Sequence, residues 1–147
     1  MKYKLIIDDK QEESIVITAH SKTDLIKEIE ALIAKDSLKL YGYKDEQIVP
    51  LDKNEVYAFY TLDGKVYASV KDDILLIKER IYQLEESFSE TFIKVNQGCL
   101  INIKKIAKFE TNLGGSIKVV MKNGYSDYIS RRELQNVKRR MGLWKNT

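Results

Sequence analysis

The sequence has 147 residues, 44% of them hydrophobic, which is enough to bury one ordinary core, or those of a small module and a larger one. No apolar run approaches the roughly 20 residues needed to cross a bilayer. Acidic residues also follow the first apolar run where a signal peptide needs a longer apolar stretch. With one cysteine and one histidine, the chain cannot form an internal disulfide and has too few ligands for a zinc site. We therefore expect a cytoplasmic protein without a metal or a cofactor.

The net charge of +3 is distributed unevenly along the chain. Residues 92–147 contain twelve Lys or Arg and three acidic residues, whereas residues 1–91 contain thirteen basic and nineteen acidic residues. A chain with a basic last third suits a partner that is a dense polyanion, and nucleic acid is the commonest such partner in a cytoplasm. A membrane surface fits less well, because no long basic amphipathic helix is present.

Residues 1–40 are predicted to form a small ββα module. Two apolar, β-branched runs, at residues 2–8 and 14–18, indicate strands joined by a polar turn. The next stretch repeats apolar residues at spacings of three and four, at Leu25, Ile29, Leu32 and Ile33. This period indicates a helix whose apolar face packs on the two strands or, less favoured, on a partner.

Residues 41–147 are predicted to form a second, mostly β domain, so the expected fold class is α+β. Short apolar and aromatic runs separated by turn residues indicate strands, near residues 38–43, 47–51, 55–61, 65–70, 74–77, 92–95, 105–110, 116–121 and 125–130. A short helix is expected from about residue 81 to 87, and a basic helix ends the chain. The pair Asn123-Gly124 is a strong signal for a hairpin turn.

Catalysis is disfavoured by the residue pattern. Gly114-Gly115 lacks the following Lys-Ser/Thr of a phosphate-binding loop. His20 and Cys99 lie within apolar segments, where a packed side chain is the default. We therefore expect a protein that is not an enzyme.

Polar donors follow a predicted strand in the stretch FIKVNQGCLINIKKIAKFE, residues 92–110. Lys94, Asn96 and Gln97 come at the end of this strand, before a second apolar run. Gln and Asn can form two hydrogen bonds with adenine in the major groove, and Lys contacts guanine or phosphate. On composition alone, a loop with solubilising polar residues explains the same pattern.

Two separated sets of residues carry a resemblance to a known family. The first set is Phe92, Lys94, Asn96, Leu100, Ile101, Asn102 and Ile106, and the second is Asn123, Gly124, Ser130, Arg131 and Arg132. From about Gln47 to Leu143, these motifs resemble the LytTR-type DNA-binding domain of bacterial transcription regulators. The ββα start resembles the small stand-alone members of that family. Lys94 and Gly98 depart from the family, which usually has Arg and Ser there.

The resemblance implies a β-rich domain, preceded by the ββα module, that docks loops on double-stranded DNA in successive major grooves. Lys94, Asn96 and Gln97 would lie in one contacting loop, Arg131 and Arg132 in a second, and Lys65 near a third. Lys138, Arg139 and Arg140 would add positive field. The implied protein is a sequence-specific transcription regulator, a homodimer on repeated sites, with a small membrane protein as a possible regulatory partner.

Two other classes of function remain open on the sequence. An RNA-binding β module would use the same charge and stack exposed aromatic rings on unpaired bases, with Tyr57, Phe59 and Tyr60 as the candidates. A protein-interaction module would act through the acidic part of the chain.

Overall fold

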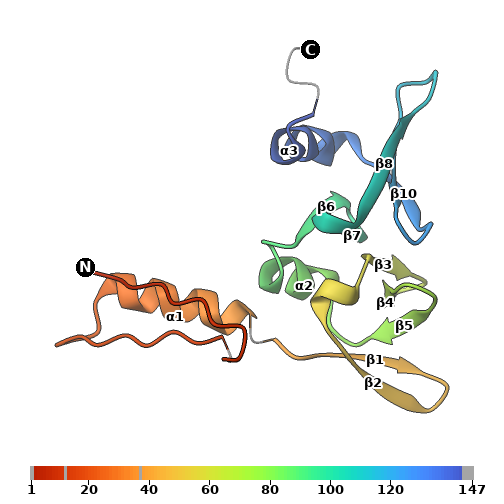
Figure 1. Ribbon diagram of the computed structural model, residues 1–147. Helices are drawn as coiled ribbons and strands as arrows, with labels where there is room; N and C mark the ends of the chain where they lie inside the picture. The colour runs from red at the N-terminus through yellow and green to blue at the C-terminus, as the bar shows by residue number, and fades with distance from the viewer. Residues whose placement is uncertain (1, 12, 37, 144–147) are drawn as a thin grey trace.

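A computed structural model describes residues 2–11, 13–36 and 38–143, and in this part the fold is α+β and mostly β (Figure 1). The helices are α1 (Asp24–Asp36), α2 (Ile81–Ser87) and α3 (Arg131–Met141), with 3₁₀ turns η1 (Lys53–Glu55) and η2 (Ile103–Lys105). The strands are β1 (Leu40–Lys44), β2 (Gln47–Leu51), β3 (Ala58–Leu62), β4 (Lys65–Ser69), β5 (Ile74–Ile77), β6 (Phe92–Asn96), β7 (Cys99–Asn102), β8 (Ile106–Thr111), β9 (Ile117–Met121) and β10 (Ser126–Ile129). Among these residues, no helix is long and apolar enough to cross a membrane.

The larger sheet has seven antiparallel strands in the order β2-β1-β5-β4-β3-β7-β6. β3 and β4 are joined by a tight turn in which Asp63 and Gly64 both have positive φ, 52° and 76°, as hairpins of this length favour. Pro50 lies in β2, at the edge of the sheet, where a missing N–H breaks no ladder. β3 and β7, which we call the central strands below, each have a hydrogen-bonded neighbour on both sides.

The smaller sheet has three antiparallel strands in the order β10-β9-β8. Both of its turns contain a glycine with positive φ, Gly115 at 82° and Gly124 at 93°. The predicted hairpin at Asn123-Gly124 is confirmed. The Asn123 amide also donates hydrogen bonds to Ser69 Oγ (2.9 Å) and to the Val70 carbonyl (2.8 Å), which tie this turn to the larger sheet.

The two faces of the larger sheet bury separate cores. On one face, Phe59 and Leu100 pack with Leu84 and Phe88 of α2. On the other face, the alternate residues of the same strands pack against the smaller sheet and α3, in a cluster that contains Ala58, Ile93, Val95, Cys99, Ile101, Ile117, Val119, Met121, Ile129 and Val137. This second core fixes the smaller sheet and α3 on β6 and β7.

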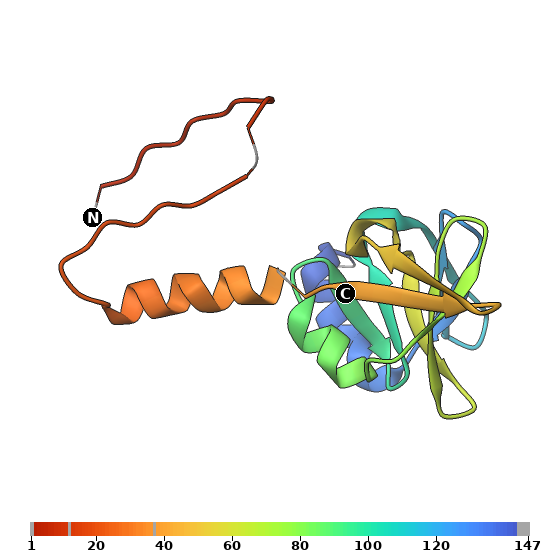
Figure 2. The same ribbon diagram turned by 90° about the horizontal axis from the view of Figure 1, so that it is seen from below.

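In the N-terminal module, the predicted helix is confirmed and the two predicted strands are wrong. The helix is present as α1, and it approaches α2 at the side of the domain. The two strands expected at residues 2–8 and 14–18 are absent, because no strand is formed among residues 2–11 and 13–23. The chain there makes a turn, with the Gln11 amide donating to the Asp8 carbonyl, but it forms no ladder. A lone two-stranded hairpin is marginally stable in water, which explains the difference. Figure 2 shows this segment and α1 reaching away from the domain.

We predict that Asn123→Ala lowers the free energy of unfolding by about 1–3 kcal/mol, because it removes two hydrogen bonds between the sheets. Denaturant unfolding measures this change. Asn112→Ala is the matched control, since the Asn112 side chain bonds only within its own turn, to Gly114 and Ser116. An equal loss in both variants would mean that Asn123 does not join the sheets.

Candidate nucleic-acid interface

Three connections between secondary-structure elements meet at one end of the central strands. The β3–β4 turn and the β6–β7 loop are joined by the Thr61 amide, which donates to the Gly98 carbonyl at 2.8 Å. The connection from β10 to α3 joins them through the Ser130 amide, which donates to the Val95 carbonyl at 2.9 Å. These backbone bonds hold the three connections in fixed positions relative to one another.

The second half of β6 and the β6–β7 loop contain three of the predicted site residues, Lys94 and Asn96 in the strand and Gln97 in the loop. The pairing of β6 with β7 shifts register between Lys94 and Asn96, and a bulge of this kind re-aims side chains. Gln97 is exposed at the tip, and Lys94 is half-buried. Gly98 lacks a hydroxyl, but its backbone connects the loop to β3.

Asn96 uses its side chain to connect the β6–β7 loop to strand β10. Its Nδ2 donates to the Tyr128 carbonyl in β10 at 2.9 Å, and its Oδ1 accepts the Gly98 N–H at 3.0 Å. Both ends of the amide are therefore engaged within the protein. This geometry gives Asn96 a positioning role beside Gln97.

Arg131 and Arg132 form the first turn of α3 and are both exposed. Ser130 caps this helix, because its hydroxyl accepts the Glu133 N–H at 3.3 Å. The N-terminus of a helix attracts anions through its free N–H groups and its dipole. The two guanidinium groups and the helix end therefore add positive potential at the same place.

Lys65 is exposed at the start of β4, directly after the turn. A surface hollow of about 430 Å³ lies between this turn, the β6–β7 loop and α2. Its lining includes Lys94 and Gln97, and also Arg80 and Tyr82, which the sequence reasoning did not single out. Tyr82 is 66% exposed, an unusual position for an aromatic ring on a helix that packs on a core.

Lys138, Arg139 and Arg140 lie at the other end of α3, away from the three connections. Arg140 donates to the carbonyls of Ser89 (2.9 Å) and Phe92 (3.3 Å), at the beginning of β6, whereas Asn96 is at its end. Arg139 donates to Asn136 Oδ1 at 2.9 Å. The structure therefore separates this cluster from the other site residues by the length of β6.

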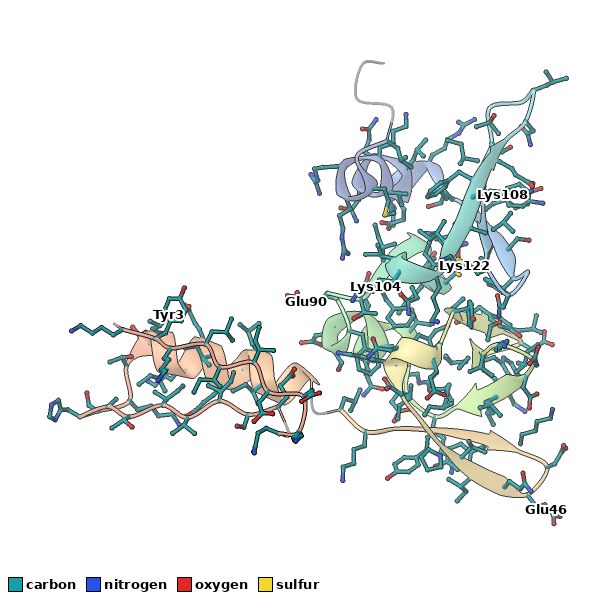
Figure 3. The ribbon with its side chains drawn as sticks, in the orientation of Figure 1. Tyr3, Glu46, Glu90, Lys104, Lys108 and Lys122 are labelled. Atoms are coloured by element: carbon teal, nitrogen blue, oxygen red, sulfur yellow. The ribbon has the colours of Figure 1, made fainter. Side chains whose placement is uncertain are left out.

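Another set of lysines lies at the opposite end of the central strands. The Asn102 amide donates to the Tyr57 carbonyl before β3 begins, so η2, with Lys104, follows at the far end from Gly98. A five-residue strand spans about 16 Å. Lys104, Lys108 and Lys122 are labelled along this side in Figure 3. Lys108 and Lys118 each form an ion pair with Glu110. The hydrogen bonds from these two lysines, that of Lys108 first, lower the pKa of the Glu110 carboxyl.

Cys99 is fully buried in the second core, as expected. Its Sγ lies 3.4 Å from the Tyr125 hydroxyl, which donates to Asp127 Oδ2 at 3.0 Å. Burial raises the pKa of the Cys99 thiol, and burial likewise raises the pKa of Tyr125. The thiol is therefore protonated and packed.

We predict that native Cys99 reacts with iodoacetamide at pH 8 at least about 100-fold more slowly than the unfolded chain, because only an exposed thiolate reacts. Mass spectrometry of the protein with and without denaturant measures the two rates. Rapid reaction of the native protein, accompanied by loss of DNA binding, would show that Cys99 is a reactive site instead.

The aromatic rings considered for RNA stacking are engaged inside the protein. Phe59 is fully buried. Tyr60 stacks on both Tyr67 and Tyr125, with ring centroids 5.7 and 5.2 Å apart. Lys105 Nζ lies 4.5 Å from the centroid of the Tyr57 ring. Phe59 is therefore unavailable to an unpaired base, and Tyr57 and Tyr60 are each already in contact with other side chains.

The fold and the site define a β-rich domain that presents basic and amide side chains on loops at one end of a sheet. This class of surface suits a polyanion. Residues 46–142 match the LytTr DNA-binding domain family. The chain therefore belongs to this family of transcription regulators, which is not a family of enzymes.

Individual relatives agree with this assignment. The chain is 28% identical over 146 residues to an uncharacterized HTH-type transcriptional regulator of Staphylococcus aureus strain MSSA476, covering 97% of this chain and 99% of that protein. A similarly named protein of strain NCTC 8325 is 27% identical with the same coverage. The fold is similar to the LytTr DNA-binding domain of a protein described as a methyl-accepting/DNA response regulator from Bacillus cereus. The TM-score is 0.67 and the identity 15%, over 73% of this chain and 100% of that one.

The names of the Staphylococcus relatives refer to a helix-turn-helix, in which two helices are joined by a short turn. In the part of this chain that the structure describes, β-strands separate α1, α2 and α3 from one another. No such helix pair is therefore present there.

Proposed function

We propose that this protein is a sequence-specific transcription regulator that docks the β3–β4 turn, the β6–β7 loop and the start of α3 on double-stranded DNA. The observation that carries the proposal is the meeting of these three connections, which lie far apart in the sequence, at one end of the central strands. Because the described helices form no helix-turn-helix, loops are the available elements for entering a major groove.

Different side chains at this end suit different contacts. Gln97 is exposed and carries the amide that can form two hydrogen bonds with adenine. Arg132 carries the planar fork that matches guanine. Lys65, Lys94 and Arg131 suit phosphates, which fix the position of the protein on the duplex. Arg80, in the hollow beside Lys94, adds a further cation.

We also propose that two copies act together on repeated sites, and that a small membrane protein restrains the regulator. Both proposals rest on the resemblance to the stand-alone members of the family. A second copy doubles the number of base contacts, and specificity increases with each base pair that is read.

We predict that Arg132→Ala weakens binding to the cognate duplex by about 1–3 kcal/mol and binding to a scrambled duplex much less, because a lost base contact removes discrimination. Fluorescence anisotropy on both duplexes, over a series of salt concentrations, measures this. With about five cations on phosphates, log K should fall against log salt with a slope of about −4 to −5.

Lys122→Ala is the matched control, since it removes one charge from the opposite end of the central strands. We expect it to leave both affinities and the salt slope nearly unchanged. If Arg132→Ala weakened both duplexes equally, Arg132 would contact phosphate. If Lys122→Ala had the larger effect, the proposed face would be wrong.

We predict that Asn96→Ala lowers cognate affinity about tenfold by releasing the loop that carries Gln97, because two hydrogen bonds are lost. Amide hydrogen exchange at Gly98 should accelerate at the same time, since its acceptor is gone. In Asn96→Asp, the oxygen that accepts the Gly98 N–H remains, while the bond to the Tyr128 carbonyl is lost. Gly98 exchange should then stay slow.

A loss of affinity in Asn96→Ala with unchanged exchange at Gly98 would contradict the positioning role. It would assign Asn96 a direct contact with DNA. Gln97→Ala serves as the comparison, because it should reduce cognate affinity without changing exchange at Gly98.

A further inference from the structure

The N-terminal module exposes an unusual number of large apolar side chains. Ten of them lie among residues 2–11 and 13–33 and are 39–92% exposed, namely Tyr3, Leu5, Ile6, Ile7, Ile15, Val16, Ile17, Leu25, Leu32 and Ile33. We call this set the module surface. In the rest of the described chain, the exposed large apolar residues are scattered over several strands, one turn and helix α2. Patches of this kind in soluble proteins mark interaction sites.

The backbone of the same segment also lacks partners. Residues 3–7 and 14–17 have the composition of strands, but they form no ladder in the structure. Unpaired N–H and C=O groups in a strand-like segment are a template for pairing with another strand. Two hairpins together supply the four strands that one hairpin lacks, and three or more strands suffice for a stable sheet.

The charge of the module helps to choose between partners. Residues 1–36 contain six Lys and eight acidic residues, with the two signs interspersed. A net negative segment does not suit DNA or an anionic lipid surface. Mixed charge suits a partner that carries the same mixture, because Lys and Glu of one copy can face Glu and Lys of the other.

The size and position of the module fit a second copy. A specific interface takes about 20 to 30 residues from each partner, and the module has about that many. Figure 2 shows α1 and the preceding segment projecting from the domain, and Figure 3 labels Tyr3 at a distance from it. Two copies that meet through this projection keep both sets of DNA-facing loops free.

We propose that the module surface is a self-association surface, on which the N-terminal modules of two copies pair through their apolar side chains and strand-like segments. This inference deepens the proposed function, on which it rests for the use of two copies. It names residues 2–11 and 13–33 as the element that joins the two copies. The domain from β1 onward then acts as the DNA-binding unit of each copy.

The test uses the full chain and a single introduced thiol. Cys99 is the one cysteine in the sequence and is buried, so a cysteine introduced by Ile7→Cys is the main reactive group. Ile7 is 88% exposed in the single chain. For a dimer with a dissociation constant of about 1 μM, we expect the alkylation rate of this thiol to fall at least about tenfold as the protein concentration rises from about 0.1 to about 100 μM. Leu113→Cys, at a turn tip of the domain, is the control whose rate should not change.

Sedimentation velocity gives the second readout. The unmodified chain should form dimers, whereas the double variant Leu5→Ser/Ile7→Ser should be a monomer under the same conditions, because the lost apolar burial raises the dissociation constant about 100-fold or more. Leu113→Ser should dimerise normally. Leu5, Ile7 and Leu113 are all exposed in the single chain. The double variant Leu5→Ser/Ile7→Ser and the control Leu113→Ser should therefore unfold at the same denaturant midpoint as the unmodified chain in its monomeric state.

A monomeric unmodified chain, with an Ile7→Cys rate independent of concentration, would overturn the inference. So would a Leu5→Ser/Ile7→Ser variant that still dimerises. If the thiol introduced by Ile7→Cys reacted more slowly only after a membrane-protein partner was added, the module surface would belong to that partner. This result would also overturn the inference. None of these readouts involves DNA, so failure of the proposed DNA contacts is detected separately, by anisotropy with Arg132→Ala.

Discussion

The bond from the Ser130 amide to the Val95 carbonyl holds the start of α3, with Arg131 and Arg132, beside the end of β6. This bond joins the end of β10 to β6. The side-chain amide of Asn96, the next residue of β6, makes a second bond between the same two strands by donating to the Tyr128 carbonyl. This junction therefore connects the start of α3, which follows the smaller sheet, to the β6–β7 loop of the larger sheet. The buried cluster around Val95, Ile129 and Val137 supports it, because an apolar core excludes water from these backbone bonds.

Local signals in the sequence predicted most of the domain. Strand β2 and helix α2 lie where the residue pattern placed them, and the Asn123-Gly124 turn follows from turn chemistry. The roles of Asn96 and Arg140 could not be predicted. Their partners are 32 and 48 residues away, and no periodicity reveals which carbonyl a side chain will reach. The strand expected at 55–61 begins later, because Asp52 caps a 3₁₀ turn at Lys53–Glu55.

The N-terminal module shows a different limit of sequence reasoning. Alternating apolar residues at 3–7 and 14–17 indicate a strand that buries one face. The pattern does not say which chain provides the other half of the core or the neighbouring strand. In the structure of one chain, α1 leaves Leu25, Leu32 and Ile33 exposed and residues 2–11 unpaired. In the proposed self-association, a second copy provides that missing half, and no local pattern can identify it.

Charge along the sequence is also a poor guide to charge in space. The last 56 residues carry twelve cations, but the strands that connect them run back and forth across the domain. Lys94, Arg131 and Arg132 reach one end of the central strands, and Lys104 reaches the other, about 16 Å away. That separation exceeds the Debye length of about 8 Å at physiological salt. In the proposed docking mode, the position of a lysine relative to the three connections, rather than its place in a basic segment, then decides whether it contributes to DNA binding.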